Sequence, residues 1–272
     1  MNVKIISFNI SSSNLNIKDD LNVLLNLNAD IYCVQELLQE HILLVKQLFN
    51  LYEIFTCQES FYNQSKEKRI PKSEQYNCIL VKKSLKILNS NIIKHIPFFK
   101  HPLLYKLILH SNTSVIESLY VDIELYDIIL RVVNIHLESF TSPSFREDQL
   151  LHIFKHVIDF NNKSQENSKP YRVCICGDFN SFAALGINFL VGYFLQYSFK
   201  DFIINEKKNL CILAKDNHLN YYKFNKSTFK RFPLELDGVL YSKELKKYLN
   251  AQILKISTSS DHYIIQVKID DI

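Results

Sequence analysis

The sequence predicts an α/β protein in which much of the strand content is antiparallel. Short apolar runs rich in β-branched and aromatic residues recur along the chain, as expected for buried strands. Segments with helical periodicity lie between several of these runs. Two runs, 115–125 and 128–135, are separated only by Tyr126-Asp127, which predicts a hairpin and therefore an antiparallel pair.

The expected strands are short, apolar and bounded by polar or turn-forming residues. They are 3–8, 31–34, 52–57, 77–82, 115–125, 128–135, 171–176, 251–257 and 263–269. Helices are expected where apolar side chains recur every three or four positions, as Leu21, Leu24 and Leu25 do. These helical segments are 19–28, 39–50 and 146–160. The polar segments expected to be surface connectors are 63–75, 161–170 and 205–231.

The chain has 272 residues and a mass of 32.0 kDa, enough to bury a sizeable core. No stretch has the length and composition of an interdomain linker, so we expect a single domain over 1–272. The hydrophobic share of 47% and the charged share of 22% are ordinary for a globular protein. The net charge of +4 is compatible with a phosphate-bearing partner but does not demonstrate one.

The 6 cysteines predict reduced, buried thiols, because they are sparse and most lie in apolar runs. A zinc site is not expected, since no second Cys/His pair has suitable spacing to Cys174 and Cys176. The N-terminus enters a strand directly, so no signal peptide is expected. No apolar stretch approaches the roughly 20 residues that span a bilayer. We expect a cytoplasmic protein, or a nuclear one in a eukaryote.

Chemically capable side chains lie at or near the ends of the apolar runs. Gly177-Asp178-Phe179-Asn180 closes one run, and Ser260-Asp261-His262 opens the last. The others are Asn9, Glu36, His136 and Asp237. Each alone has an ordinary explanation as a turn former, a solvated carboxylate or a hydrogen-bonded core histidine. Carboxylates gathered at one sheet edge repel unless a cation neutralises them, and Mg²⁺ binds through carboxylates plus substrate phosphate.

Six short segments occur in order between residues 3 and 267. They are Ser7-Phe8-Asn9, Gln35-Glu36, Asn134-Ile135-His136-Leu137, Gly177-Asp178-Phe179-Asn180, Asp237 and Ser260-Asp261-His262. This set resembles the endonuclease/exonuclease/phosphatase superfamily. The resemblance implies a four-layered α/β sandwich, in which two mostly antiparallel sheets pack face to face with helices outside. It places the catalytic site at one edge and makes the whole chain one catalytic domain.

The resemblance also implies a metal centre and a means of activating water. Glu36 would be the principal Mg²⁺ ligand, with Asn9 and Asp261 close to the metal and Mn²⁺ as a substitute ion. Asp178 would orient or deprotonate the attacking water, and Asn180 would hold a phosphate oxygen. Positioning and electrostatic stabilisation of this kind supply most of phosphoryl-transfer catalysis.

Two histidines would contact the phosphate in the same scheme. His262, polarised by Asp237, would stabilise charge on the phosphoryl group, and His136 would contact the scissile phosphate from the other side. Glu74 precedes a strand, as does the acid that pairs with the first histidine in the deoxyribonuclease branch. An ordinary loop glutamate explains Glu74 equally well.

The phrase His136-Leu137-Glu138-Ser139, followed by Arg146 and Gln149-Leu150, is most similar to the 5′-tyrosyl-DNA phosphodiesterases. Arg146 is equally explained as a structural ion-pairing residue. The leading hypothesis is therefore a monomeric Mg²⁺-dependent phosphodiesterase that hydrolyses nucleic acid, DNA before RNA, without stable membrane insertion. The alternatives are a sphingomyelinase-like lipid or inositol phosphodiesterase or phosphatase, and a catalytically silent binding module. The sequence does not identify protein partners.

Overall fold

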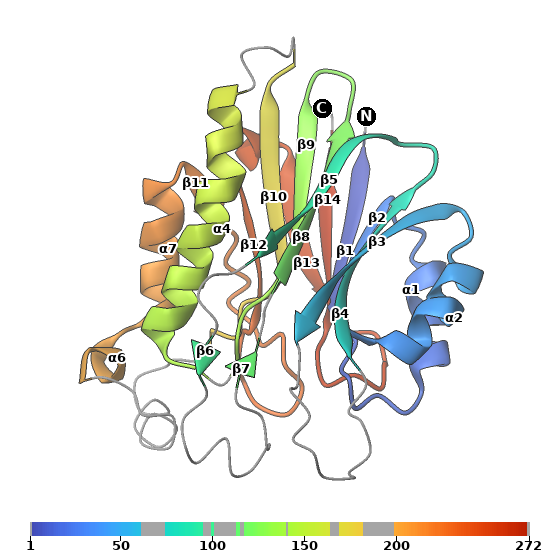
Figure 1. Ribbon diagram of the computed structural model, residues 1–272, viewed down its shortest axis with the longest axis horizontal. Coiled ribbons are helices and arrows are strands. Elements are labelled where there is room, and N and C mark those ends of the chain that lie inside the picture. Colours follow the sequence, from blue (N-terminus) through green and yellow to red (C-terminus); the bar gives the residue numbers. More distant parts are fainter. Residues whose placement is uncertain are drawn as a thin grey trace.

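Two mixed sheets of six strands each lie face to face in the computed structural model (Figure 1). The first sheet has the order β13-β14-β1-β2-β4-β3, and the second has the order β11-β12-β10-β9-β8-β5. Within them, β1–β2 and β9–β10 pair in parallel, and the other neighbours pair antiparallel. The structure describes residues 2–60, 74–94, 99–100, 113–114, 117–139, 141–163, 169–181 and 199–270.

The strand bounds are as follows. The first sheet contains β1 (Val3–Asn9), β2 (Ile31–Leu38), β3 (Tyr52–Ser60), β4 (Gln75–Lys82), β13 (Leu249–Leu254) and β14 (Ile264–Ile269). The second contains β5 (Lys86–Lys94), β8 (Glu117–Glu124), β9 (Ile129–His136), β10 (Tyr171–Asp178), β11 (Leu219–Tyr221) and β12 (Asp237–Ser242). A separate small pair consists of β6 (Phe99–Lys100) and β7 (Thr113–Ser114).

Helices cover the outer faces of the two sheets (Figure 1). The first sheet packs against α1 (Ile17–Asn26) and α2 (Ile42–Leu48), and the second packs against α4 (Pro143–Lys163) and α7 (Glu206–Asp216). The shorter helical elements are η1 (Gln39–His41), α6 (Phe199–Ile203) and η3 (Lys243–Lys247). The order helix, sheet, sheet, helix is the predicted four-layered α/β sandwich, and that prediction is confirmed.

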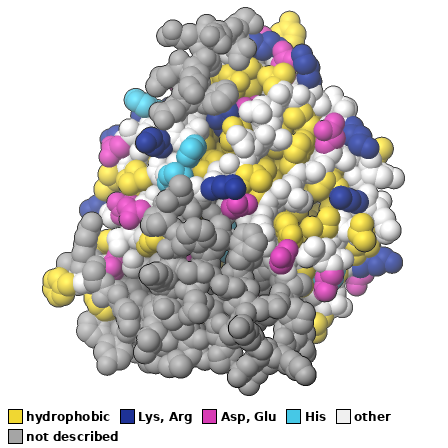
Figure 2. Space-filling view, viewed as in Figure 1, with side chains coloured by type: hydrophobic (Ala, Val, Ile, Leu, Met, Phe, Trp, Pro, Cys, Tyr) yellow, Lys and Arg dark blue, Asp and Glu magenta, His cyan; other side chains and the backbone are white. Residues whose placement is uncertain are grey.

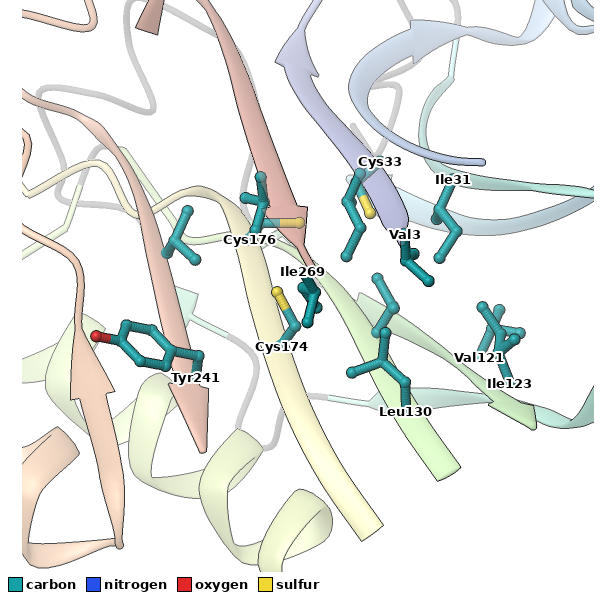
Figure 3. Packing of buried hydrophobic residues seen from close by; sticks show 14 of the residues in the cluster. Val3, Ile31, Cys33, Val121, Ile123, Leu130, Cys174, Cys176, Tyr241 and Ile269 are labelled. Carbon is teal, nitrogen blue, oxygen red and sulfur yellow. The ribbon is translucent and has the colours of Figure 1, made fainter. Parts of the chain in front are cut away.

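The central core lies between the two sheets (Figure 3). Cys33 comes from β2 in the first sheet, and Cys174 and Cys176 come from β10 in the second. Cys174 and Cys176 share one face of β10 because alternate side chains of a strand point the same way. All 6 cysteines are free thiols, as predicted, and all except the half-buried Cys211 are buried. Burial raises the pKa of the Cys33 thiol well above its ordinary value.

Most of the predicted elements are present with shifted ends. The hairpin that joins β8 to β9 is confirmed, and the Leu125 amide donates to the Ile128 carbonyl across its turn at 2.9 Å. The strand expected over 251–257 instead spans Leu249–Leu254. β5 was not predicted, because most of its side chains are exposed or half-buried and its sequence lacks an apolar run. Residues 63–73 and 164–168 of the expected connectors lie outside the described residues.

The prediction that 205–231 is a connector is wrong for its first half, which contains α7 and β11. Five charged residues mask the helical periodicity of α7, whose sequence is EKKNLCILAKD. Its buried face consists of Leu210 and Ala214, four positions apart, with Leu213 partly buried beside them. The Asn205 side chain caps this helix by accepting a hydrogen bond from the Lys208 amide at 3.0 Å.

The surface shows no single field of charge over the coloured part of the face in Figure 2, where basic and acidic side chains are interspersed. None of the helices in the described ranges is long and apolar enough to cross a bilayer. Both chain ends lie at one end of the molecule (Figure 1). β1 runs from that end, so Asn9 at its C-terminus lies toward the opposite end.

Close packing at Gly177 yields a first prediction. A Cβ atom built on Gly177 would lie 1.9 Å from the Ile135 carbonyl oxygen, and the glycine has φ +142°. Gly177→Ala should therefore cost about 3 kcal/mol or more of unfolding free energy, measured by urea denaturation. Its register partner offers a matched control: a Cβ at Gly238 would meet Phe179 ring atoms at 3.0 Å, and a side chain can shift. Equal losses for the two alanine variants would contradict this explanation.

Candidate active site

Strand register gathers the predicted site residues at one edge of the sandwich. The parallel pair β1–β2 sets Asn9 opposite Gln35, next to Glu36. In the second sheet, Asp178 is opposite His136 on one side and opposite Asp237 on the other. The ends of strands from both sheets therefore deliver polar groups to the same place.

The Asp178 carboxylate lies at the centre of this group. Its Oδ2 atom is 3.0 Å from Asn9 Nδ2, 3.8 Å from His136 Nε2 and 3.7 Å from His262 Nε2. Its Oδ1 atom accepts a hydrogen bond from the Asn180 amide at 2.8 Å. Asp178 is 1% exposed, so these charges act across a medium in which they are weakly screened.

Asn9 joins the two sheets at the site. Its Nδ2 donates both to Glu36 Oε1 at 2.9 Å and to Asp178 Oδ2 at 3.0 Å. Its Oδ1 accepts from the Ser11 amide at 3.0 Å, which fixes the orientation of the side-chain amide. As placed, Asn9 therefore separates two carboxylates by donating to each of them.

Glu36 is held in an ionised state by its surroundings. Its Oε2 accepts from the Ser12 amide at 2.8 Å, and Asn9 donates to Oε1. Burial raises the pKa of Glu36, but the charge on His136 and these hydrogen bonds outweigh burial and lower it below the ordinary value. Glu36 thus presents an ionised carboxylate at neutral pH.

The partner of His136 is Glu59, which the sequence analysis missed. Glu59 Oε1 contacts His136 Nδ1, and Glu59 Oε2 accepts from the Glu36 amide at 2.8 Å. Burial lowers the pKa of His136, but the adjacent Glu59 carboxylate more than offsets it and raises that pKa well above the ordinary value. Glu74 instead accepts a hydrogen bond from the Tyr76 hydroxyl at 2.8 Å. The available signal was alternation: Cys57 and Glu59 share one face of β3.

The structure brings His262 into contact with Asp237, the pairing that the resemblance implies. His262 Nδ1 donates to Asp237 Oδ2 at 2.9 Å, and Asp237 is 2% exposed. Burial lowers the pKa of His262, but Asp237 and Asp178 outweigh burial and raise it to about 9. The adjacent carboxylates therefore favour the protonated form of both histidines. Neither Nε2 atom is within hydrogen-bonding distance of a partner in the described chain, so both remain able to donate to a ligand.

A buried acid on α1 shapes the loop that carries His262. Asp20 accepts hydrogen bonds from the Ser259 amide at 3.0 Å and the Ser260 amide at 3.2 Å. The Ser260 hydroxyl in turn donates to the Asn9 carbonyl at 2.7 Å. The Lys230 ammonium closes the other side of the loop by donating to the Ser260 carbonyl at 2.6 Å. The sequence offered no signal for Asp20, which looked like an ordinary acid in the first turn of a helix.

Three other predicted residues have contacts that bear on their proposed roles. Asn180 is buried, and its Nδ2 donates to the Leu137 carbonyl at 2.8 Å. The Asp261 carboxylate lies 3.2 Å from Arg231 Nε, an ion pair at the rim of the site. Arg146 is buried on α4 and donates to both oxygens of Glu206 at 2.5 and 3.1 Å, so a structural ion pair explains it.

The oxygen donors at this edge fit a hard divalent cation. Glu36 accepts one hydrogen bond at each oxygen, whereas a carboxylate offers about four lone-pair sites. Its remaining lone pairs suit the oxygen preference of Mg²⁺. Asp178, Asp237 and His262 also place ligand atoms within 4.8 Å of one another. In that cluster, His262 Nδ1 already donates a hydrogen bond to Asp237, so this nitrogen is not available to a metal. Glu36 is therefore the better magnesium ligand.

Solved structures with a similar fold include three differently named proteins. ANGEL2, described as a 2′,3′-cyclic phosphatase, matches with TM-score 0.64 and 17% identity over 98% of this chain and 95% of its own. The human Nocturnin catalytic domain, with bound sulfate, matches with TM-score 0.62 and 16% identity over 98% and 92%. Truncated TDP2 from Caenorhabditis elegans matches with TM-score 0.57 and 16% identity over 99% and 97%.

The chain shares its fold with these three structures, and this is the four-layered sandwich that the resemblance in the sequence implied. No protein-family model matches the sequence, and no curated protein does. At 16–17% identity the likeness to these structures shows the fold alone.

The His262–Asp237 pair predicts a specific pH dependence in metal-free protein. A histidine whose folded pKa is raised stabilises the fold below its unfolded pKa of about 6.5 and loses that effect as pH rises through 9. The free energy of unfolding should therefore fall between these values, by at most roughly 3 kcal/mol. NMR titration of the His262 ring with a chelator present measures the pKa directly. Asp237→Asn should lower it, and a wild-type value at or below about 6.5 would contradict the assignment.

Proposed function

We propose that this chain is a Mg²⁺-dependent phosphodiesterase that hydrolyses nucleic acid. One observation carries the proposal: a buried carboxylate, Asp178, lies between two histidines, each in contact with a second carboxylate, at the edge that also presents Glu36. This places a base or water-orienting group beside donors suited to a phosphate. Phosphoryl transfer needs this combination of positioning and positive charge.

Different residues of the chain would activate the water and bind the phosphate. Asp178 orients the attacking water or accepts its proton, because its Oδ2 is directed into the space between the two histidines. His262 and His136 donate from Nε2 to phosphoryl oxygens, and each ring is held by a carboxylate at Nδ1. Asn180 has a second Nδ2 hydrogen beyond the one donated to Leu137, and we assign it to a phosphate oxygen.

Glu36 would hold the metal, with Asn9 and Asp261 close to it. A bound Mg²⁺ would neutralise charge on the phosphate and help orient the water, and Mn²⁺ is the expected substitute. Asn9 directs its Nδ2 toward Glu36, and Asp261 pairs with Arg231. We therefore rank both residues below Glu36 as candidate metal ligands. The ionised state of Glu36 favours cation binding at neutral pH.

The structural neighbours support phosphate chemistry with nucleotide-like ligands. ANGEL2 is described as a 2′,3′-cyclic phosphatase and has a structure with adenosine-2′,3′-vanadate. The Nocturnin structure holds a sulfate anion. Similarity to TDP2 agrees with the His136-Leu137-Glu138-Ser139 phrase, which resembles the tyrosyl-DNA phosphodiesterases. For this chain we therefore rank DNA, including 5′-tyrosyl DNA, before RNA.

A parallel substrate panel tests the proposal. Purified protein with Mg²⁺ or Mn²⁺ is incubated with single- and double-stranded DNA, RNA, a 5′-tyrosyl oligonucleotide, sphingomyelin and phosphoinositides. We expect hydrolysis of a nucleic-acid substrate that stops when EDTA removes the metal. Turnover of only the lipid substrates would identify a lipid phosphodiesterase, and turnover of none would leave a binding module; either result overturns the proposal.

Two substitutions test the assigned roles. Asp178→Asn and His262→Ala should each lower kcat by about 10²- to 10⁴-fold, because they remove a proton acceptor and a charge-stabilising donor. Circular dichroism and urea denaturation check that both variants fold. Asp19→Asn and His41→Ala are matched controls outside the site and should retain the wild-type rate. Wild-type kcat in either test variant would refute its role.

A further inference from the structure

Glu36 reaches the site because β2 contains a bulge. The pairing of β2 with β4 passes from Val34 opposite Cys78 to Leu37 opposite Tyr76, so two residues face one on the other strand. Glu36 has φ 58°, a left-handed conformation that costs a non-glycine residue free energy. A bulge of this kind redirects a side chain, and its strained backbone persists only when neighbouring groups hold it.

Asn134 holds this bulge from the opposite sheet. Its Nδ2 donates to the Val34 carbonyl at 3.0 Å and to the Cys78 carbonyl at 2.9 Å, the two residues where the register shift begins. Its Oδ1 accepts from Gln35 Nε2 at 2.6 Å. Asn134 lies on β9, whereas its three partners lie on β2 and β4. One amide of the second sheet therefore contacts both sides of the bulge in the first.

Asn134 and Gln35 form a buried polar pair in an otherwise apolar interface. Both side chains are 0% exposed at the interface between the sheets, where most contacts are between apolar side chains. Gln35 Oε1 has no hydrogen-bond partner in the described chain, so the pair carries a desolvation cost. An apolar pair would avoid that cost but would leave the Val34 and Cys78 carbonyls without these donors.

We propose that Asn134 is a positioning residue that fixes the Glu36 bulge and thereby presents the Glu36 carboxylate to the metal. It acts through the backbone of β2 and β4, because its side chain donates to the Val34 and Cys78 carbonyls. The functional importance of Glu36 rests on the proposed function, but the link from Asn134 to the bulge rests on the hydrogen bonds alone. The same residue also lies two positions before His136, so it ties the placement of Glu36 to the strand that carries this histidine.

Amide hydrogen exchange tests the inference without substrate or metal. The reporters are the Glu36 amide, which donates to Glu59, and the Ser12 amide, which donates to Glu36. Asn134→Leu removes both hydrogen bonds from Nδ2 to the bulge without adding charge. Exchange at the two reporters should rise about tenfold relative to amides elsewhere in β2 and β9. A second readout, Mn²⁺ binding followed by electron paramagnetic resonance, should show affinity weakened by about tenfold.

Val132→Ala is the matched control. It removes buried methyl groups from the same face of β9 and should lower global stability without selective change at the reporters. If Asn134→Leu does not fold, Gln35→Met tests the pair from its other end and should raise exchange at the same two amides. Reporter exchange that matches the Val132→Ala pattern would overturn the inference. Wild-type protein that binds no Mn²⁺ would count against the proposed function, while exchange would still decide the role of Asn134.

Discussion

The candidate site depends on one hydrogen-bonded bridge across the sandwich. Asn9 at the end of β1 donates from a single amide nitrogen to Glu36 of its own sheet and to Asp178 of the other. Two carboxylates that face the same amide would otherwise repel each other. The bridge holds them together, so the carboxylate proposed to orient water and the carboxylate proposed to hold the metal can belong to different sheets.

Buried carboxylates in contact with the two histidines determine the charge of the histidine rings at the site. Glu59 contacts the far nitrogen of His136, and Asp237 accepts a hydrogen bond from that of His262. Both acids are buried, so their effect on the histidines is strong, and they raise the pKa of both rings above the ordinary value. Each histidine therefore forms an ion pair with a buried carboxylate, and this pairing reduces the free-energy cost of burying either charge.

Much of the fold and most of the site were predictable from sequence, for a physical reason. Alternating or continuous apolar runs reveal buried strands, and polar residues at their ends reveal a functional edge. Elements with a mostly solvated surface, such as β5 and α7, lacked that signal. Glu59 was missed because its role comes from a contact with His136, 77 positions away along the chain. Register and bulges decide such contacts, as the redirected Glu36 shows.

We propose that the two sheets together form one metal-dependent site, in which Glu36 of the first sheet holds the metal. Calorimetric titration of Mg²⁺ into wild-type protein and the variants Glu36→Gln and Asp19→Asn tests it directly. We expect one bound ion per chain, with affinity weakened more than about tenfold by Glu36→Gln and unchanged by Asp19→Asn. Equal Mg²⁺ affinity in wild-type protein and Glu36→Gln would contradict it.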